Sequence, residues 1–226
     1  MLYNSVFIAK GNRMKKTASS YESVSGTVNS LFPSFHETPE EPMKLALSWF
    51  KYAQLEKVRE PRSMVLSTVN SAMEITSRVM AIIEFNYDGI VFATHSCSRK
   101  ISDISVNNHA CAHLYWKELA RQLSIAGSIE EMPRETAEKV WAGRPVPLHS
   151  MSSVSRQSEP LQSPGQIMHA ANALAAKGAL PCPDHFSVYK LVPDYVEFWS
   201  ASSDRLHNRL RFKKENVHWN VSWLQP

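Results

Sequence analysis

Residues 78–95 read RVMAIIEFNYDGIVFATH and contain two apolar, β-prone runs on either side of Asn86-Tyr87-Asp88-Gly89. Asn, Asp and Gly are turn formers, so this stretch predicts two antiparallel strands joined by a short turn. Similar short runs with turn-like connections recur along the chain after residue 58. Parallel strands would need a long crossover at each connection, and we therefore expect an antiparallel β-barrel.

The other elements are predicted from the same signals. We expect strands at 63–69, 78–85, 90–95, 110–116, 123–131, 186–192, 195–200, 205–212 and 217–223, with a turn at Pro193-Asp194. Helices are expected at 98–107, 133–142, 164–177 and from about residue 40 to Val58, where Met43, Leu47, Phe50 and Ala53 form an apolar stripe. The fold class is mainly β with flanking helices.

The charge of the chain is concentrated at one end. The 226 residues are 43% hydrophobic and carry a formal net charge of +4. Residues 1–20 account for this excess. They contain four cations, Lys10, Arg13, Lys15 and Lys16, and they lack acidic residues. The near-neutral body argues against a general nucleic-acid footprint. We expect residues 1–31 to be a disordered, basic, Ser-rich tail and residues 32–226 to form a single domain.

The cysteines and apolar runs bear on the compartment. Cys97, Cys111 and Cys182 have no CxxC spacing, which favours a reducing, cytoplasmic compartment, and we find no membrane segment. His109, Cys111 and His113 would share one face of a strand, which is formally a metal-ligand set. Their two-residue spacing separates neighbouring side chains by about 6.5–7 Å, too wide to close easily on one ion, so we expect ordinary polar residues and no metal.

Two basic clusters are candidates for anion binding. In RLHNRLRFK at 205–213, five cationic or potentially cationic side chains lie at every second position, and Leu206, Leu210 and Phe212 lie on the other side, which predicts a strand with one basic face. A solvated edge strand protected by charge is the alternative. Ser98-Arg99-Lys100 opens a predicted helix with cations at the end that repels them, a conflict that a bound phosphate would resolve. Arg78 and the loop 153–158 offer further donors, and two solvated side chains are the alternative here.

Seven segments, taken in order, resemble the pyridoxamine-phosphate oxidase family. They are REPRSMVLSTV (59–69), SRVMAIIEF (77–85), GIVFATHSCSRK (89–100), ARQLSIAG (120–127), SVSRQSE (153–159), VEFWSASSDRLHNRLRF (196–212) and WNVSWLQP (219–226). Three further pieces, FPSF (32–35), HSMSSVSRQSEPLQ (149–162) and LQP (224–226), resemble the branch that acts as a flavin oxidase in phenazine biosynthesis.

The resemblance implies an FMN-dependent, homodimeric split β-barrel whose active sites are shared between subunits. Arg78, Arg99 and Lys100 match positions around the FMN phosphate and ribityl chain, to which the helix-opening pattern adds Ser98. The strand that lines the flavin matches Val79, Met80, Ala81, Ile82 and Ile83. Ala93 and Thr94 stand where the family has a tyrosine-threonine pair. Gln122, Gln157, Ser158, Trp199 and Arg209 match the remaining flavin contacts, and Arg205 and His207 match the pair that faces the substrate.

One departure from the family bears on the substrate. The family binds the vitamin phosphate with a lysine, a tyrosine, an arginine and a serine, and the matching residues here are Ile83, Val140, Arg144 and Leu148. Losing three polar contacts of about 1–2 kcal/mol each would remove two to four decades of affinity. We therefore expect an oxidase of partly reduced phenazine carboxylic acids that uses dioxygen, with Arg144, Arg205 and His207 at the substrate. A vitamin B6 phosphate oxidase and a non-catalytic flavin-binding protein are the alternatives.

Overall fold

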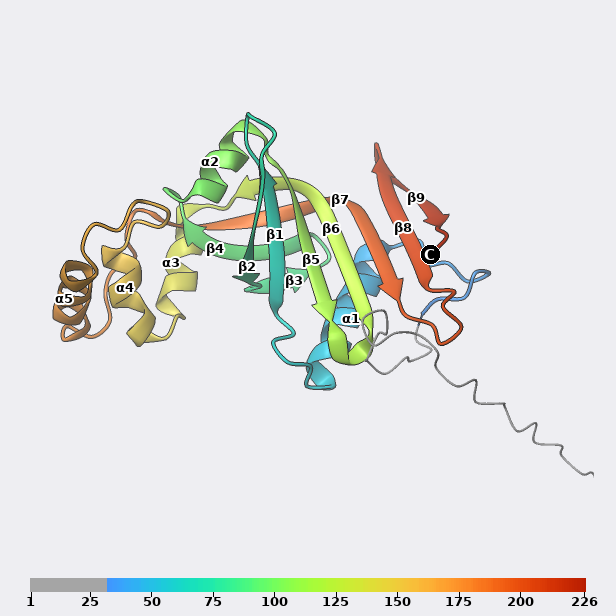
Figure 1. The fold of residues 1–226 in the computed structure, drawn as a ribbon, viewed down its shortest axis with the longest axis horizontal. Helices are drawn as coiled ribbons and strands as arrows, with labels where there is room; N and C mark the ends of the chain where they lie inside the picture. Colours follow the sequence, from blue (N-terminus) through green and yellow to red (C-terminus); the bar gives the residue numbers. More distant parts are fainter. Residues whose placement is uncertain (1–31) are drawn as a thin grey trace, which may run out of the picture.

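The computed structural model describes residues 32–226 (Figure 1), so the expected tail at 1–31 lies outside the described residues. The elements are α1 (Pro42–Leu55), β1 (Ser63–Val69), β2 (Ile75–Ala81), β3 (Glu84–Asn86), β4 (Gly89–His95), α2 (Arg99–Val106), β5 (His109–Trp116), η1 (Lys117–Leu119), β6 (Arg121–Glu131), α3 (Arg134–Ala142), η2 (Val146–Leu148), α4 (His149–Val154), α5 (Pro164–Ala175), β7 (Phe186–Ser200), β8 (Asn208–Glu215) and β9 (His218–Trp223).

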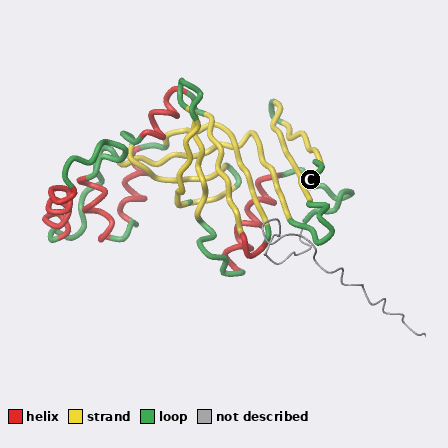
Figure 2. Tube along the Cα trace, viewed as in Figure 1, coloured by secondary structure: helices red, strands yellow, loops and turns green. Residues whose placement is uncertain are grey.

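The nine strands of the described chain form one antiparallel sheet in the order β2-β1-β5-β6-β7-β4-β3, and β8 and β9 extend it from β7. In Figure 1 the sheet curls into a half-barrel, with α3, α4 and α5 at one end and β8, β9 and the C-terminus at the other. Figure 1 and Figure 2 show α1 behind the strands of the sheet, whereas α3, α4 and α5 lie beyond its end. The predicted mainly β fold with flanking helices is confirmed.

Strand β7 differs from the prediction of two strands with a turn at Pro193-Asp194. It runs unbroken over 15 residues and pairs with β6 from Tyr189 to Ser200. Its other edge pairs with β4 up to Leu191 and with β8 from Tyr195. Pro193 lies between these two partners, where neither β4 nor β8 pairs with this edge of β7. On the β6 side the register shifts at Gly127, whose added Cβ would lie 2.0 Å from the Val192 carbonyl oxygen.

The predicted strand 78–85 is divided in the structure. Strand β2 begins earlier, at Ile75, and ends at Ala81, and β3 begins at Glu84. Between them the Ile82 amide donates to the Arg62 carbonyl at 2.8 Å and the Ile83 amide donates to the Val91 carbonyl at 2.8 Å. The chain therefore changes partners here, from β1 to β4, and periodicity alone does not reveal such a corner.

The prediction of a strand from Arg205 is also wrong, because β8 begins at Asn208. Arg205 has a φ of 68° and lies in a turn in which Asp204 accepts hydrogen bonds from the Ser202 hydroxyl and the Leu206 amide. Leu206, expected on the apolar side, is 66% exposed. The basic face of the strand is thus limited to Arg209, Arg211 and Lys213, while Leu210 and Phe212 are buried as predicted.

The main core lies between α1 and the inner face of the sheet. The predicted stripe of Met43, Leu47, Phe50 and Ala53 is buried there, and Trp49 packs edge-on against Phe198 of β7 at 5.1 Å. Within the described part of the chain, no helix is long and apolar enough to cross a membrane. The opposite face of β1, β2, β5 and β6 carries side chains that are exposed or half-buried.

Candidate active site

Three cations gather where β2 meets the start of α2. Arg78 comes from β2, and Arg99 and Lys100 form the first turn of the helix. The charge of Arg99 lowers the pKa of Arg78, and the charge of Arg78 lowers the pKa of Lys100, so the three cations lie within electrostatic reach of one another. The sequence prediction that these residues form one cluster agrees with this geometry.

Lys100 is the most unusual member because its side chain is only 5% exposed. Its ammonium donates to the Thr94 hydroxyl at 3.0 Å and to the Gln157 Oε1 atom at 2.8 Å, both neutral acceptors. Burial and the charge of Arg78 lower the pKa of Lys100 to about 8, with Cys97 opposing them. A buried ammonium held by neutral groups is electrostatically under-compensated, and an anion would complete its surroundings.

Arg78 is fixed by a network of neighbouring strands. Its guanidinium donates to the Thr68 hydroxyl at 2.8 Å, the Thr76 hydroxyl at 2.6 Å and the Leu66 carbonyl at 3.2 Å. Both threonines donate to Asp103 of α2, at 2.7 and 3.3 Å. Burial lowers the pKa of Arg78 while Asp103 raises it. The network ties β1, β2 and α2 together around the basic cluster.

The two serines of the cluster complete a set of donors. Ser98, the N-cap of α2, is fully buried, and its Oγ atom has no hydrogen-bond partner within the described residues. Ser158 has a φ of 80° and accepts from the Arg99 amide at 3.1 Å. A buried hydroxyl without a partner, at the N-terminus of the helix that carries Lys100, matches the donor chemistry of a phosphate site. The residues therefore fit the FMN phosphate.

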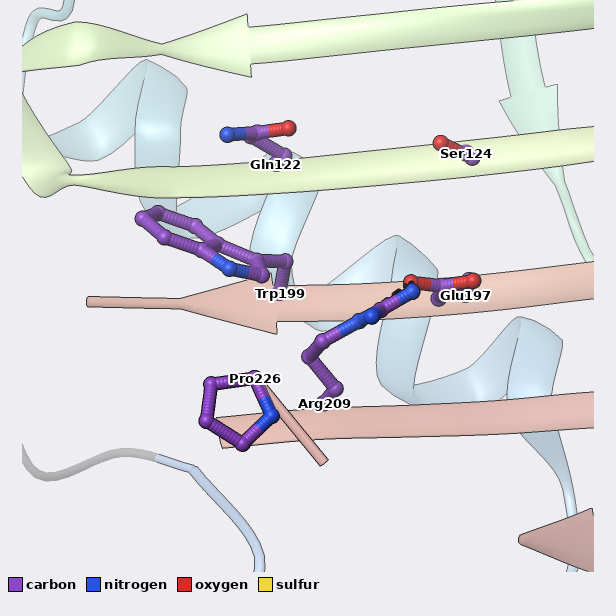
Figure 3. A pocket seen from close by; sticks show the side chains of 6 residues that line it. All are labelled: Gln122, Ser124, Glu197, Trp199, Arg209 and Pro226. Atoms are coloured by element: carbon purple, nitrogen blue, oxygen red, sulfur yellow. Dashed lines mark hydrogen bonds and ion pairs between the residues drawn. The ribbon is translucent and has the colours of Figure 1, made fainter. Parts of the chain in front are cut away.

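A second candidate region is a cavity of about 240 Å³ on the outer face of β6, β7 and β8. It is lined by Gln122, Ser124, Glu197, Trp199, Arg209 and Pro226 (Figure 3). Gln122 pairs with Trp199, and Trp199 pairs with Arg209, so three expected flavin contacts form one row across three strands. The His207 ring lies 5.0 Å from the Trp199 ring, and its Nδ1 accepts from the Ser202 amide at 3.1 Å.

The expected substrate residue Arg144 follows α3, at the end of the sheet where α3, α4 and α5 lie. Its guanidinium lies 5.8 Å from the Trp141 ring centre and 5.5 Å from that of Phe186, and burial lowers its pKa. Ile83 and Val140 pack against the same small core. Three of the four positions that match the family's ligands to the vitamin phosphate, here called the vitamin-phosphate clamp, therefore lie together. Burial, His185, Lys100 and Arg144 lower the pKa of His95 to about 4. Lys100 and Arg144 therefore both lie within electrostatic reach of His95.

The remaining predicted site residues lie on different faces and elements of the structure. Val79 and Ala81 of the expected flavin-lining strand are exposed, Met80 is half-buried on the other face, and Ile82 is buried in the main core. Ala93 packs with Val91 and Phe186. Arg205 and His207 lie in the turn before β8 and not on one strand face with Arg209. The prediction that Arg205 and His207 share one strand face with Arg209, Arg211 and Lys213 is therefore wrong.

His109, Cys111 and His113 do share a face of β5, but each has a separate surrounding. His109 lies 3.1 Å from Asp194, and the Nδ1 of His113 lies 2.8 Å from the Ser124 hydroxyl. No group of three or more His, Cys, Asp or Glu residues in residues 32–226 could hold a metal ion.

Sequence reasoning missed Thr68, Thr76 and Asp103, and it missed Glu197 in the cavity. The contact between Asp103 and the threonines joins segments about 30 residues apart, and no local pattern marks it. Glu197 had a usable signal, since it stands two residues before Trp199 in a predicted strand and so shares its face.

Comparison with known proteins identifies the family. Residues 50–177 match the pyridoxamine 5'-phosphate oxidase family, and residues 186–226 match the pyridoxine 5'-phosphate oxidase C-terminal dimerisation region. The chain belongs to the pyridoxamine 5'-phosphate oxidase family. The resemblance stated from the sequence motifs is thereby confirmed.

Members of this family that are similar to the chain include two with a phenazine name. Dihydrophenazinedicarboxylate synthase of Burkholderia lata is 41% identical, over 92% of this chain and 99% of that protein. The synthase of the same name from Pseudomonas chlororaphis is 36% identical, over 91% and 93%. The crystal structure of PhzG from Burkholderia lata 383 in complex with tetrahydrophenazine-1-carboxylic acid superposes with a TM-score of 0.86 at 40% identity, covering 89% of this chain and all of that one.

Proposed function

We propose that this protein is an FMN-dependent oxidase that aromatises a partly reduced phenazine carboxylic acid during phenazine biosynthesis. The observation that carries the proposal is the surroundings of Arg144. Ile83 and Val140, which replace two polar residues of the vitamin-phosphate clamp, pack with Trp141 and Phe186 into one apolar cluster beside it. Such a surface suits a fused ring with a carboxylate and offers little to a phosphate. The names of the two synthases and the PhzG ligand support the same substrate class.

The flavin site in this proposal is shared by two subunits. Thr94, which bonds Lys100, pairs with Ser187 of β7, whereas Gln122 pairs with Trp199 of the same strand. Twelve residues of strand separate Ser187 from Trp199, about 40 Å along the chain. A short ribityl chain does not span that length. We place the FMN phosphate on Lys100 of one subunit and the ring beside Trp199 and Arg209 of the other.

The match of residues 186–226 to a dimerisation region supports this arrangement. Because Arg144 lies at the phosphate end and His207 lies beside Trp199, with Arg205 two residues before His207, the substrate in this proposal also contacts both subunits. We assign Arg144 and Arg205 to its carboxylate and His207 to proton transfer at the ring. Bound FMN supplies the two-electron redox chemistry, with dioxygen as the acceptor. Three free cysteines support a reducing, cytoplasmic setting.

The test is anaerobic mixing of the FMN-loaded protein with tetrahydrophenazine-1-carboxylic acid, followed by flavin absorbance. We expect bleaching with this substrate and negligible bleaching with pyridoxine 5'-phosphate. Arg205→Ala should slow the reaction by about 2–4 kcal/mol in transition-state terms, because carboxylate binding and ring orientation are lost together. Efficient oxidation of pyridoxine 5'-phosphate would identify a vitamin B6 oxidase, and no bleaching by either compound would identify a flavin-binding protein without turnover.

A further inference from the structure

We propose that Glu197 is a positioning residue that holds Arg209 in the orientation needed at the flavin ring. The inference rests on the proposed function, because it requires Arg209 to face the flavin. Glu197 carries no role in the family resemblance, yet it lines the same cavity as Gln122, Trp199 and Arg209 (Figure 3).

The contacts of Arg209 are specific. Its Nε and Nη2 atoms both donate to Oε1 of Glu197, at 3.0 and 2.7 Å, and its Nη1 donates to the Gln225 carbonyl at 3.2 Å. A guanidinium has five N–H donors in one plane, so these three bonds fix the plane and leave one N–H on each terminal nitrogen for a ligand. In Figure 3 the guanidinium points along the strands toward Glu197, with Pro226 on its other side.

The carboxylate is itself held in place. Its second oxygen, Oε2, accepts from the Tyr195 hydroxyl at 2.5 Å. Burial, together with this hydrogen bond and the charge of Glu197, raises the pKa of Tyr195 to about 12, so the phenol remains a donor at neutral pH. Tyr195 and Glu197 lie on the same face of β7, and both are only partly accessible to water.

The Arg209–Glu197 pair is more protected than an ordinary surface ion pair. The side chain of Glu197 is 16% exposed and that of Arg209 is 32% exposed. A free arginine side chain loses much rotamer freedom when it binds a ligand, and a pre-formed clamp removes part of that cost before the ligand arrives. Glu197 therefore contributes to flavin binding by positioning Arg209 and does not itself contact the flavin.

The experiment is a double-mutant cycle on FMN affinity, measured by quenching of flavin fluorescence in the apo-dimer. Glu197→Gln should weaken FMN binding by roughly tenfold, within the range for a charged hydrogen bond, and Arg209→Ala by at least as much. In the Arg209→Ala background, Glu197→Gln should cause no further loss, because the group it positions is absent. The exposed Glu215→Gln on β8 is the matched control and should leave the affinity unchanged.

Equal losses from Glu197→Gln in both backgrounds would overturn the inference, since they would mean that Glu197 acts on packing or on the flavin independently of Arg209. An unchanged affinity in Glu197→Gln would also overturn it while leaving the flavin site in place. If Arg209→Ala itself binds FMN normally, the proposed flavin site is wrong as well. Glu197→Asp, which keeps the charge, serves in the same cycle if Glu197→Gln fails to fold.

Discussion

Replacing Lys100 with methionine tests the phosphate end of the proposed site. Methionine keeps most of the length of the side chain and removes its charge and its donors. Lys100 is 5% exposed, and its ammonium makes two hydrogen bonds to neutral acceptors, Thr94 and Gln157. Thr94 also donates to Gln157 at 2.9 Å, so this pair retains a bond of its own in the variant. The apoprotein should accordingly unfold at the same temperature or higher.

FMN binding should respond in the opposite direction. A hydrogen bond from a charged group contributes about 1.5–3 kcal/mol, so losing the one from Lys100 to the phosphate should raise the dissociation constant by roughly 10- to 150-fold. Fluorescence titration of the apo-dimer measures this constant, and thermal melting of the apoprotein measures stability. Lys177→Met, which changes an exposed lysine just after α5, is the control and should alter neither.

The pH dependence gives a second check on the same residue. Burial and Arg78 lower the pKa of Lys100 in the apoprotein to about 8. A bound phosphate favours the charged form and raises this pKa, so above pH 8 binding must take up a proton. FMN affinity should therefore fall above pH 8, by up to about tenfold per pH unit, and the fall should be much smaller in Lys100→Met. Unchanged affinity in Lys100→Met at pH 7 would show that the start of α2 does not hold the phosphate.

Two further predictions concern the dimer and the sheet. In a mixed dimer of Lys100→Met and Arg209→Ala subunits, isolated with two different tags, one site regains both residues, and we expect about one tightly bound FMN per dimer by absorbance; none would mean that each site lies within a single subunit. Gly127→Ala should lower the free energy of unfolding by about 1–3 kcal/mol in urea, because its Cβ would lie 2.0 Å from the Val192 carbonyl oxygen. An unfolding midpoint equal to that of the wild type would show that the backbone shifts at this position without loss of stability.

Local patterns predicted most of the elements and failed where the chain changes partners. Alternation and turn residues located the strands β1, β4, β5, β6 and β9 to within a few residues. The division of 78–85 and the continuity of β7 depend on which strand lies alongside, and that information is not local. The start of β8 was misplaced because basic residues alternate from Arg205, although Ser202 and Asp204 are turn formers that fold back on the chain.

The candidate site was predictable in its parts and not in its arrangement. The sequence Ser98-Arg99-Lys100 predicted an anion site because it places two cations in the first turn of a helix. The structure adds that Ser98 and Lys100 are buried. Gln122 and Trp199 were recognised only through the family resemblance, because each is an ordinary strand residue by pattern. The network of Arg78 with Thr68 and Asp103 needs three elements in register, which no sequence window contains.

The length of β7 links the fold to the proposed activity. One edge of this strand pairs first with β4, which carries Thr94, and then with β8, which carries Arg209. In the proposed site, the residues assigned to the phosphate therefore lie near one end of β7 and those assigned to the ring lie near its other end. We infer that a monomer holds two half-sites that lie too far apart to bind one flavin. In the proposed dimer a second copy brings each half-site against its complement, so the partner change at Pro193 would make flavin binding depend on dimerisation.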